Sequence, residues 1–150
     1  MQKTKLVAVI ATAVTLFAAP AFAADNPAAD AAYAEIEKTF GTVPTHIKGY
    51  PKSAVSGAWE MTKGLLFGEG NELEPKVKSL IGLAVAAQIP CEYCIWADTM
   101  AAKAAGATDE EIGEAVALAG HTRNWSTMFN GLQVDFDQFK KDLGGEMAAK

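Results

Sequence analysis

The sequence predicts an all-α fold, a bundle of five to seven helices. Alanine, the strongest helix former, is abundant along the whole chain. Apolar residues recur at helical spacing between prolines and glycines, which mark the expected helix ends. No run of β-branched residues alternates with polar ones, and helical patterns flank the single Asn130-Gly131 pair. We therefore expect helices throughout and no hairpin.

The first 23 residues are typical of a signal peptide. Lys3 and Lys5 precede an uncharged apolar run over residues 6–19, and Ala21-Phe22-Ala23 fits a small-residue cleavage site. The run is short for a membrane span, although an uncleaved N-terminal anchor is the alternative. We expect an exported protein, periplasmic or secreted, with a single domain over residues 24–150.

The charge of the mature chain excludes some partners. Without Lys3 and Lys5, the formal net charge changes from −5 to about −7. This acidity argues against binding to nucleic acid or to an anionic membrane surface.

Two helices are expected before residue 70. The first begins near Asn26, with Pro27 in its first turn, and ends at Gly41 after an apolar stripe of Tyr33, Ile36 and Phe40. A loop over residues 42–46 follows. The second opens at Pro51 and closes at Gly68 and Gly70, with Val55, Trp59, Thr62 and Leu66 on one face. Trp59 is expected in the core, as are Met61 and Trp96.

The next two helices surround Pro90. One opens at Pro75 and is apolar on nearly all sides after Ser79, which predicts that it is buried. Pro90 ends it, and the next helix runs from about Cys91 to Ala105 with Gly106 as its C-cap.

Two helical segments are expected after Gly106. Thr108 and Glu111 form a capping box, and Ile112, Val116 and Ala119 should point inward. The segment 121–131 either continues this helix or breaks near Asn124. A last amphipathic helix carries Phe136, Phe139 and Leu143, and the residues after Gly145 should fray.

Cys91 and Cys94 are the only cysteines and form one C-x-x-C. A disulfide across so short a loop constrains the unfolded chain very little and so stabilises the fold little. It is better suited to reversible reduction and oxidation. At a helix start the dipole favours a thiolate, more so at Cys91. We hypothesise a redox-active dithiol, which rests as a disulfide in an oxidising compartment. The alternatives are an inert disulfide and a metal site with Asp98 and His121.

Asp98 follows Cys94 by four residues and Cys91 by seven, so the three share one helical face. Asp98 is therefore a candidate general base that accepts the proton of Cys94. The alternative is a solvated surface carboxylate.

A polar run over residues 120–127 supplies further candidates. His121 is a second possible base, or else a capping histidine. Arg123 is predicted to lower a thiol pKa or to pair with Asp98, unless it pairs with a surface acid. Trp125 is a candidate wall of a pocket.

The sequence resembles the AhpD-like alkylhydroperoxidases of the carboxymuconolactone decarboxylase superfamily. The likeness lies in residues 76–81 through Cys91-Glu92-Tyr93-Cys94-Ile95, with a lead-in over 40–44 and a turn over 106–112. It implies an AhpD-like bundle that assembles as a trimer or hexamer. It also implies that Cys94 attacks the peroxide and Cys91 resolves the product, an assignment that we prefer to the dipole argument.

Three positions depart from the pattern of that family. Ser79 stands where a Glu usually precedes the first cysteine, Asp98 stands where a His usually follows the second, and Tyr93 replaces a His found in some members. We therefore expect an atypical proton relay and slow peroxide reduction. The predicted function is thiol-dependent reduction of a hydroperoxide or disulfide, with a separate thiol reductant and no cofactor. The alternative is a non-redox binding or assembly protein with a structural disulfide.

Overall fold

The computed structural model describes residues 25–144, and within this range it contains seven α-helices, one π-helical turn and no β-strand. This confirms the predicted all-α fold. The described chain divides into two compact units, with the division between Trp59 and Glu60. The expectations for residues 1–23 and for the chain after Gly145 lie outside the described residues. No helix within 25–144 has the length and hydropathy needed to span a bilayer.

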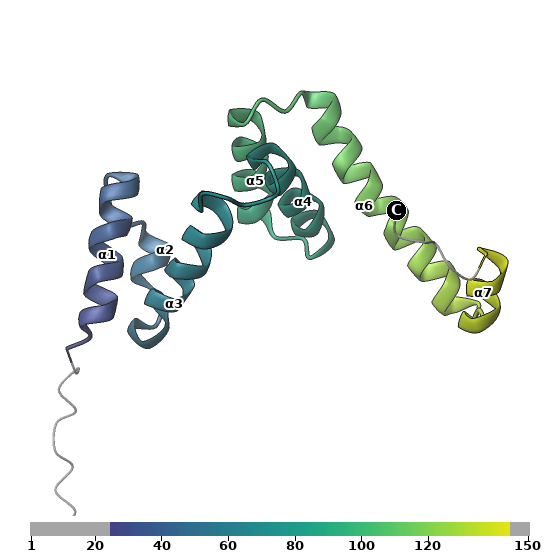
Figure 1. Ribbon diagram of the computed structural model, residues 1–150, viewed down its shortest axis with the longest axis horizontal. Helices are drawn as coiled ribbons and strands as arrows, with labels where there is room; N and C mark the ends of the chain where they lie inside the picture. Colours follow the sequence, from purple (N-terminus) through teal and green to yellow (C-terminus); the bar gives the residue numbers. More distant parts are fainter. Residues whose placement is uncertain (1–24, 145–150) are drawn as a thin grey trace, which may run out of the picture. The chain divides into compact units, whose positions relative to one another are not determined.

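The first unit contains α1 (Pro27–Phe40), α2 (Thr45–Lys48) and the start of α3 (Lys52–Thr62) (Figure 1). The side chain of Asn26 caps α1 by accepting a hydrogen bond from the Ala29 N–H at 3.1 Å. Gly41 ends α1 in the left-handed conformation with φ 75°. The predicted ends of this helix are therefore confirmed.

Trp59 lies at the centre of the core of the first unit, as predicted. It clusters with Ala32 and Ile36, and Val43 and Ile47 pack against them. Its indole Nε1 donates to Glu35 Oε2 at 2.8 Å, so the polar end of the buried ring is satisfied.

The loop expected over residues 42–46 is partly wrong, because residues 45–48 form α2. Pro44 occupies its N-cap and Ile47 packs onto the core, so a tertiary contact stabilises a turn too short to show a helical pattern. The second predicted helix ends at Gly68 as expected, but its last part is the π-helical turn η1 (Lys63–Phe67). Asn71 Nδ2 donates to the carbonyls of Gly64 and Gly68 beside this turn.

The second unit contains α4 (Pro75–Gln88), α5 (Glu92–Ala104), α6 (Asp109–Gly131) and α7 (Phe136–Asp142). Helix α4 packs against both α5 and α6, and Figure 1 shows α4 and α5 side by side. The capping box of Thr108 and Glu111 at the start of α6 is present as predicted. Helix α6 continues through Asn124, which decides between the two expectations for residues 121–131.

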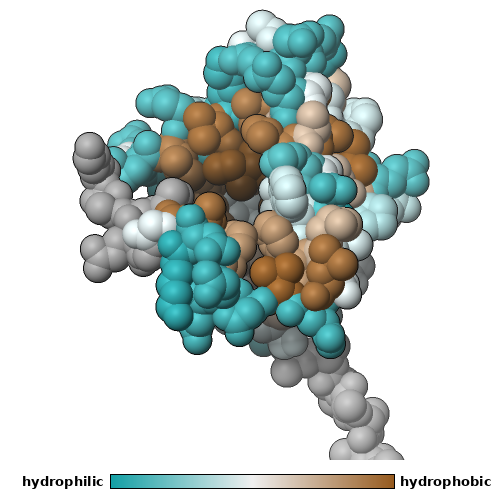
Figure 2. All heavy atoms as spheres, turned by 90° about the vertical axis from the view of Figure 1, so that its right-hand side faces the viewer, coloured by the Kyte–Doolittle hydropathy of each residue, from teal (hydrophilic) through white to brown (hydrophobic). Residues whose placement is uncertain are grey.

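The prediction that the third helix is buried on all sides is wrong. Leu83 and Ala86 of α4 are buried, whereas an apolar stripe at four-residue spacing is exposed and consists of Val77, Ile81, Val85 and Ile89. Ile81 is 51% and Val85 54% exposed, since α5 and α6 cover only the other side of this helix. Figure 2 shows a face on which hydrophobic side chains lie open between hydrophilic ones.

Several other burial predictions also fail. Trp96 is 70% and Met61 64% exposed, although both were expected in the core. On α6, Ala119 is buried but Val116 is exposed. An apolar side chain is buried only where another segment of the chain covers it. Helical spacing predicts which residues share a face but not which segment packs against that face.

Candidate functional site

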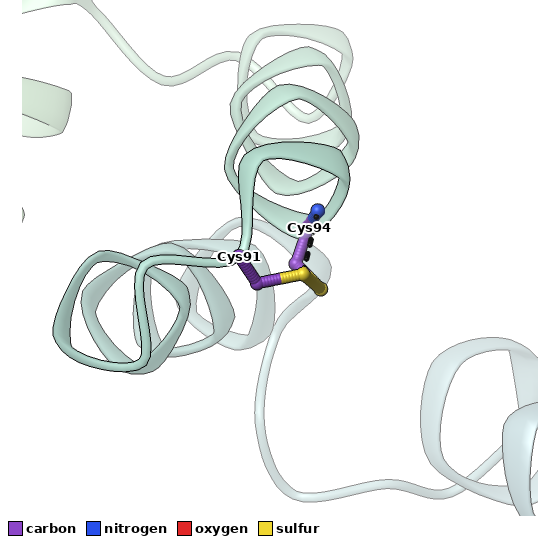
Figure 3. Close-up of a disulfide and its surroundings, with 2 residues drawn as sticks. All are labelled: Cys91 and Cys94. Atoms are coloured by element: carbon purple, nitrogen blue, oxygen red, sulfur yellow. Dashed lines mark hydrogen bonds between the residues drawn. A yellow bond between two sulfur atoms is a disulfide. The ribbon is translucent and has the colours of Figure 1, made fainter.

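The two cysteines form a disulfide at the start of α5. Cys91 is the N-cap of this helix, and its Sγ accepts a hydrogen bond from the Cys94 N–H at 3.2 Å (Figure 3). The Cys91 N–H donates to the Ala86 carbonyl at 3.0 Å, which joins the dithiol to the last turn of α4. Both cysteines are half-buried. The sulfurs therefore lie at a helix N-terminus with partial access to solvent.

This geometry has a chemical consequence for the reduced pair. The N–H of Cys94 and the positive end of the α5 dipole both stabilise a negative charge on the Cys91 sulfur. A stabilised thiolate is also the better leaving group in thiol–disulfide exchange. When a thiol attacks the sulfur of Cys94, the charge released on Cys91 already has a hydrogen-bond donor.

Asp98 is half-buried on α5, one helical turn beyond Cys94. Its carboxylate lies against Gly82 of α4, where an added Cβ would come within 2.9 Å of Cγ and both oxygens. No hydrogen bond or ion pair joins Asp98 to another residue within 25–144. Burial raises the pKa of Asp98 above the ordinary value for an aspartate. Asp98 is therefore partly shielded from solvent, and its role as a base stays a prediction.

Ser79 and Tyr93 make no contact with the dithiol that the described structure records. Ser79 Oγ donates to the Pro75 carbonyl of its own helix at 3.0 Å. The hydroxyl proton of Ser79 is therefore used in a hydrogen bond within α4. Tyr93 is 85% exposed and forms no hydrogen bond or ring contact with any described residue. Their roles in a relay or pocket stay predictions.

Within the described residues, Arg123 pairs neither with Asp98 nor with a surface acid, and its effect on a thiol pKa stays a prediction. Its Nε donates to Gln88 Oε1 at 2.7 Å, because the packing of α6 on α4 places it at the C-terminal end of α4. Arg123 is thus bound to Gln88, which precedes Cys91 by three residues in the sequence.

His121 contacts Trp125 within the same helix. Its Nε2 accepts a hydrogen bond from Trp125 Nε1 at 3.1 Å, and Trp125 stacks on Phe129 with 5.2 Å between ring centroids. His121 also lines an open hollow of about 440 Å³ with Glu114, Ala117 and Leu118. Trp125 does not line this hollow, and the structure records no contact between His121 and either cysteine among the described residues.

The structure does not support the metal-site alternative. Among residues 25–144, no three His, Cys, Asp or Glu side chains come together in an arrangement that could hold a metal ion. Cys91, Cys94, Asp98 and His121 are therefore not assembled as a ligand set.

Gly82 is the site residue that sequence reasoning missed. Glycine within a helix costs roughly 1 kcal/mol relative to alanine, so an isolated glycine in an apolar helix requires a reason. That signal was present in the sequence, but its partner on α5 became evident only when the two helices were packed together.

Comparison with known proteins identifies the family and the fold. The sequence model of the carboxymuconolactone decarboxylase family matches residues 55–135, which include the dithiol, Gly82 and Asp98. The crystal structure of the alkylhydroperoxidase AhpD core from Rhodospirillum rubrum is similar, with a TM-score of 0.63 and 28% sequence identity. That match covers 75% of this chain and 85% of the other. No curated protein sequence is significantly similar to this chain. The chain belongs to the carboxymuconolactone decarboxylase family and has an AhpD-like fold.

Proposed function

We propose that this protein is a thiol-dependent oxidoreductase that reduces a hydroperoxide or a disulfide through Cys94 and Cys91. The observation that carries the proposal is the disulfide at the N-terminus of α5, with the Cys94 N–H directed at the Cys91 sulfur. Its family membership and its likeness to an alkylhydroperoxidase core support the same chemistry.

With a hydroperoxide, the Cys94 thiol loses its proton to the Asp98 carboxylate, and the thiolate attacks the terminal peroxide oxygen. The O–O bond breaks, Cys94 becomes a sulfenic acid, and the departing alkoxide takes the proton from Asp98 and leaves as an alcohol. The Cys91 thiol gives up its proton and its thiolate attacks the Cys94 sulfur, so that the disulfide closes and the departing hydroxide takes up that proton to leave as water. A thiol reductant supplies the two electrons and two protons that restore the dithiol.

The assigned roles agree with the dipole effect that favours charge on Cys91. A resolving cysteine must attack a sulfenic acid and later leave as a thiolate, and both steps benefit from the Cys94 N–H and the helix N-terminus. Cys94 lies one turn from Asp98 and so has a proton acceptor at hand. In this proposal, the Cys91 thiolate is stabilised by a hydrogen-bond donor and the helix dipole, whereas the Cys94 thiol is deprotonated by Asp98.

Two measurements on the dithiol test this function. The reduction potential, measured against a dithiothreitol or glutathione buffer, should lie above about −300 mV, the upper limit for structural disulfides. One equivalent of tert-butyl hydroperoxide should convert the reduced protein to the disulfide. Cys91→Ser should stop at a sulfenic acid that dimedone traps, and Cys94→Ser should not react.

A binding or assembly protein with an inert disulfide would behave differently. Its potential would lie below that limit, and its reduced form would not reduce tert-butyl hydroperoxide to the alcohol. Either pair of results excludes one of the two functions.

We also propose that the protein is exported and assembles as a homotrimer or homohexamer. The exposed stripe of α4 supports assembly, because apolar side chains spaced along one helix face gain free energy when a second copy covers them. Val85→Lys should lower the mass measured by light scattering after gel filtration, whereas Glu114→Lys at an exposed polar position should not.

Mass spectrometry of the exported protein should find an N-terminus near Ala24, and a full-length chain would contradict export by cleavage.

A further inference from the structure

We infer that Gly82 is a positioning residue for Asp98: the absence of a side chain on α4 leaves the space that holds the Asp98 carboxylate, one helical turn from Cys94. This inference rests on the proposed function, in which Asp98 accepts the proton of Cys94. It concerns a residue that carries no functional group, so its role follows from shape alone.

The contact at Gly82 differs from those of the other helical glycines. A Cβ built there would lie 2.9 Å from Cγ, Oδ1 and Oδ2 of Asp98, closer than side chains approach in folded proteins. A Cβ built at Gly57, Gly113 or Gly120 would meet nothing within 4 Å. The space at Gly82 is therefore filled by one specific group, the carboxylate.

Backbone geometry does not explain this glycine. Gly82 lies inside α4 and has no positive φ, so an alanine would fit its conformation and favour the helix by roughly 1 kcal/mol. The feature that disfavours alanine is the carboxylate of Asp98 on the facing helix, which would have to move. The glycine therefore lowers the stability of α4 relative to alanine, and it leaves room for the side chain of Asp98.

Within residues 25–144, no cation pairs with Asp98. Lys76 pairs with Glu111, Lys103 pairs with Asp109, and Arg123 is bound to Gln88. Lys78, four residues before Gly82 on α4, forms no ion pair with Asp98, and Glu92 on α5 carries a charge of the same sign as Asp98. With no charged or hydrogen-bonding partner within the described chain, the packing against Gly82 is the contact that determines where the carboxylate lies.

The packing also sets the chemistry of the carboxylate. Contact with α4 removes water from one side of Asp98, and this burial raises the pKa of its carboxyl. A carboxylate with a raised pKa is a stronger base, which favours transfer of a thiol proton to it. A methyl group at position 82 would push the carboxylate towards solvent. Because the displaced atoms end a short flexible side chain, the fold should tolerate the change.

The test uses Gly82→Ala, with Gly113→Ala as the matched control at an open helical position. Both are made in a Cys91→Ser chain, in which Cys94 is the only thiol, and the rate of reaction with tert-butyl hydroperoxide is measured between pH 5 and pH 9. We expect Gly82→Ala to slow the reaction about tenfold. This loss is part of the roughly 10²–10⁴-fold rate acceleration that a positioned general base contributes. Gly113→Ala should leave the rate unchanged. In an Asp98→Asn chain, Gly82→Ala should have no further effect. An unchanged rate, or an equal loss with and without Asp98, would overturn the inference.

A second readout does not depend on activity. The pKa of Asp98, followed by the carboxyl ¹³C shift in the otherwise unaltered chain, should fall towards the ordinary aspartate value in Gly82→Ala and stay in place in Gly113→Ala. If this shift occurs but Asp98→Asn leaves the peroxide rate unchanged, the positioning is real and the proposed base role of Asp98 fails. If the pKa does not move, Gly82 does not position Asp98. Should Gly82→Ala fail to fold, adding Asp98→Ala should restore the fold, and failure of that rescue would contradict the close contact.

Discussion

Arg123 on α6 donates a hydrogen bond from its Nε to Gln88 Oε1, at 2.7 Å, in the last turn of α4. The chain leaves that turn through Pro90 and enters the dithiol at Cys91. This contact therefore ties α6 to the segment on which the cysteine pair depends. Pairing with Asp98 was one of the expectations for the same arginine, and the described structure shows the contact with Gln88 in its place.

Removing either member of this contact should destabilise the protein modestly. Arg123→Ala and Gln88→Ala should each lower the free energy of unfolding in urea by about 0.5–1.5 kcal/mol, the usual net value of one hydrogen bond. The double variant should lose less than the sum of the two, since both changes remove one interaction. Thr122→Ala, an exposed neighbour bonded only within α6, serves as the control. Fully additive losses would contradict the contact.

Glu111 should stabilise the fold in a pH-dependent way. The hydrogen bond from Lys76, and then that from the Thr108 N–H, lower the pKa of Glu111 below its ordinary value of 4.5. A carboxylate with a lowered pKa contributes stability above 4.5 that is lost as the pH falls through its folded value. Glu111→Gln should therefore lower the urea midpoint at pH 7 and have a smaller effect at pH 3.

The matched control for that substitution is Glu110→Gln. Glu110 is exposed and adjacent, and no ion pair within the described residues involves it. Its removal should change the pH dependence much less. Equal effects of the two substitutions would mean that the bonds to Lys76 and Thr108 contribute nothing in solution.

Asp98 should have the opposite effect on stability. Because burial raises its pKa, the folded state binds its proton more tightly than the unfolded state, and stability falls as the pH rises through this range. Asp98→Asn should therefore stabilise the protein at pH 7 by a small amount, within about 0.5 kcal/mol for a half-exposed group. The gain should vanish below the ordinary aspartate pKa of 3.8. Thermal unfolding at pH 3 and pH 7 measures it, with Glu114→Gln as an exposed control, and a loss of stability at pH 7 would contradict the prediction.

Restoring the family relay should accelerate peroxide reduction. Ser79 lies three residues before Gly82 on α4, one turn from the contact with Asp98. A glutamate at 79 and a histidine at 98 would thus lie on facing parts of α4 and α5. The Ser79→Glu/Asp98→His variant should raise the second-order rate with tert-butyl hydroperoxide by about tenfold or more. Stopped-flow kinetics measures the rate, circular dichroism confirms the fold, and an unchanged rate in a folded variant would disprove the relay argument.

The sequence predicted the parts of this protein that depend on neighbouring residues. Asn26 and Gly41 at the ends of α1, and Thr108 with Glu111 at the start of α6, were readable because caps act within a single helical turn. The placement of Cys91 at the start of α5 and of Asp98 one turn beyond Cys94 followed from spacing in the same way. The family resemblance, which spans several such local signals, was confirmed by the match over residues 55–135.

The tertiary structure decided everything that depends on which surfaces meet. Burial along α4 could not be read from its composition, because α5 and α6 cover Leu83 and Ala86 and leave Ile81 and Val85 exposed. The same packing brings Gly82 to Asp98 and Gln88 to Arg123, pairs with no sequence signal linking their members. Helical periodicity identifies the residues that share a face, whereas contact between two faces depends on how the helices pack in three dimensions.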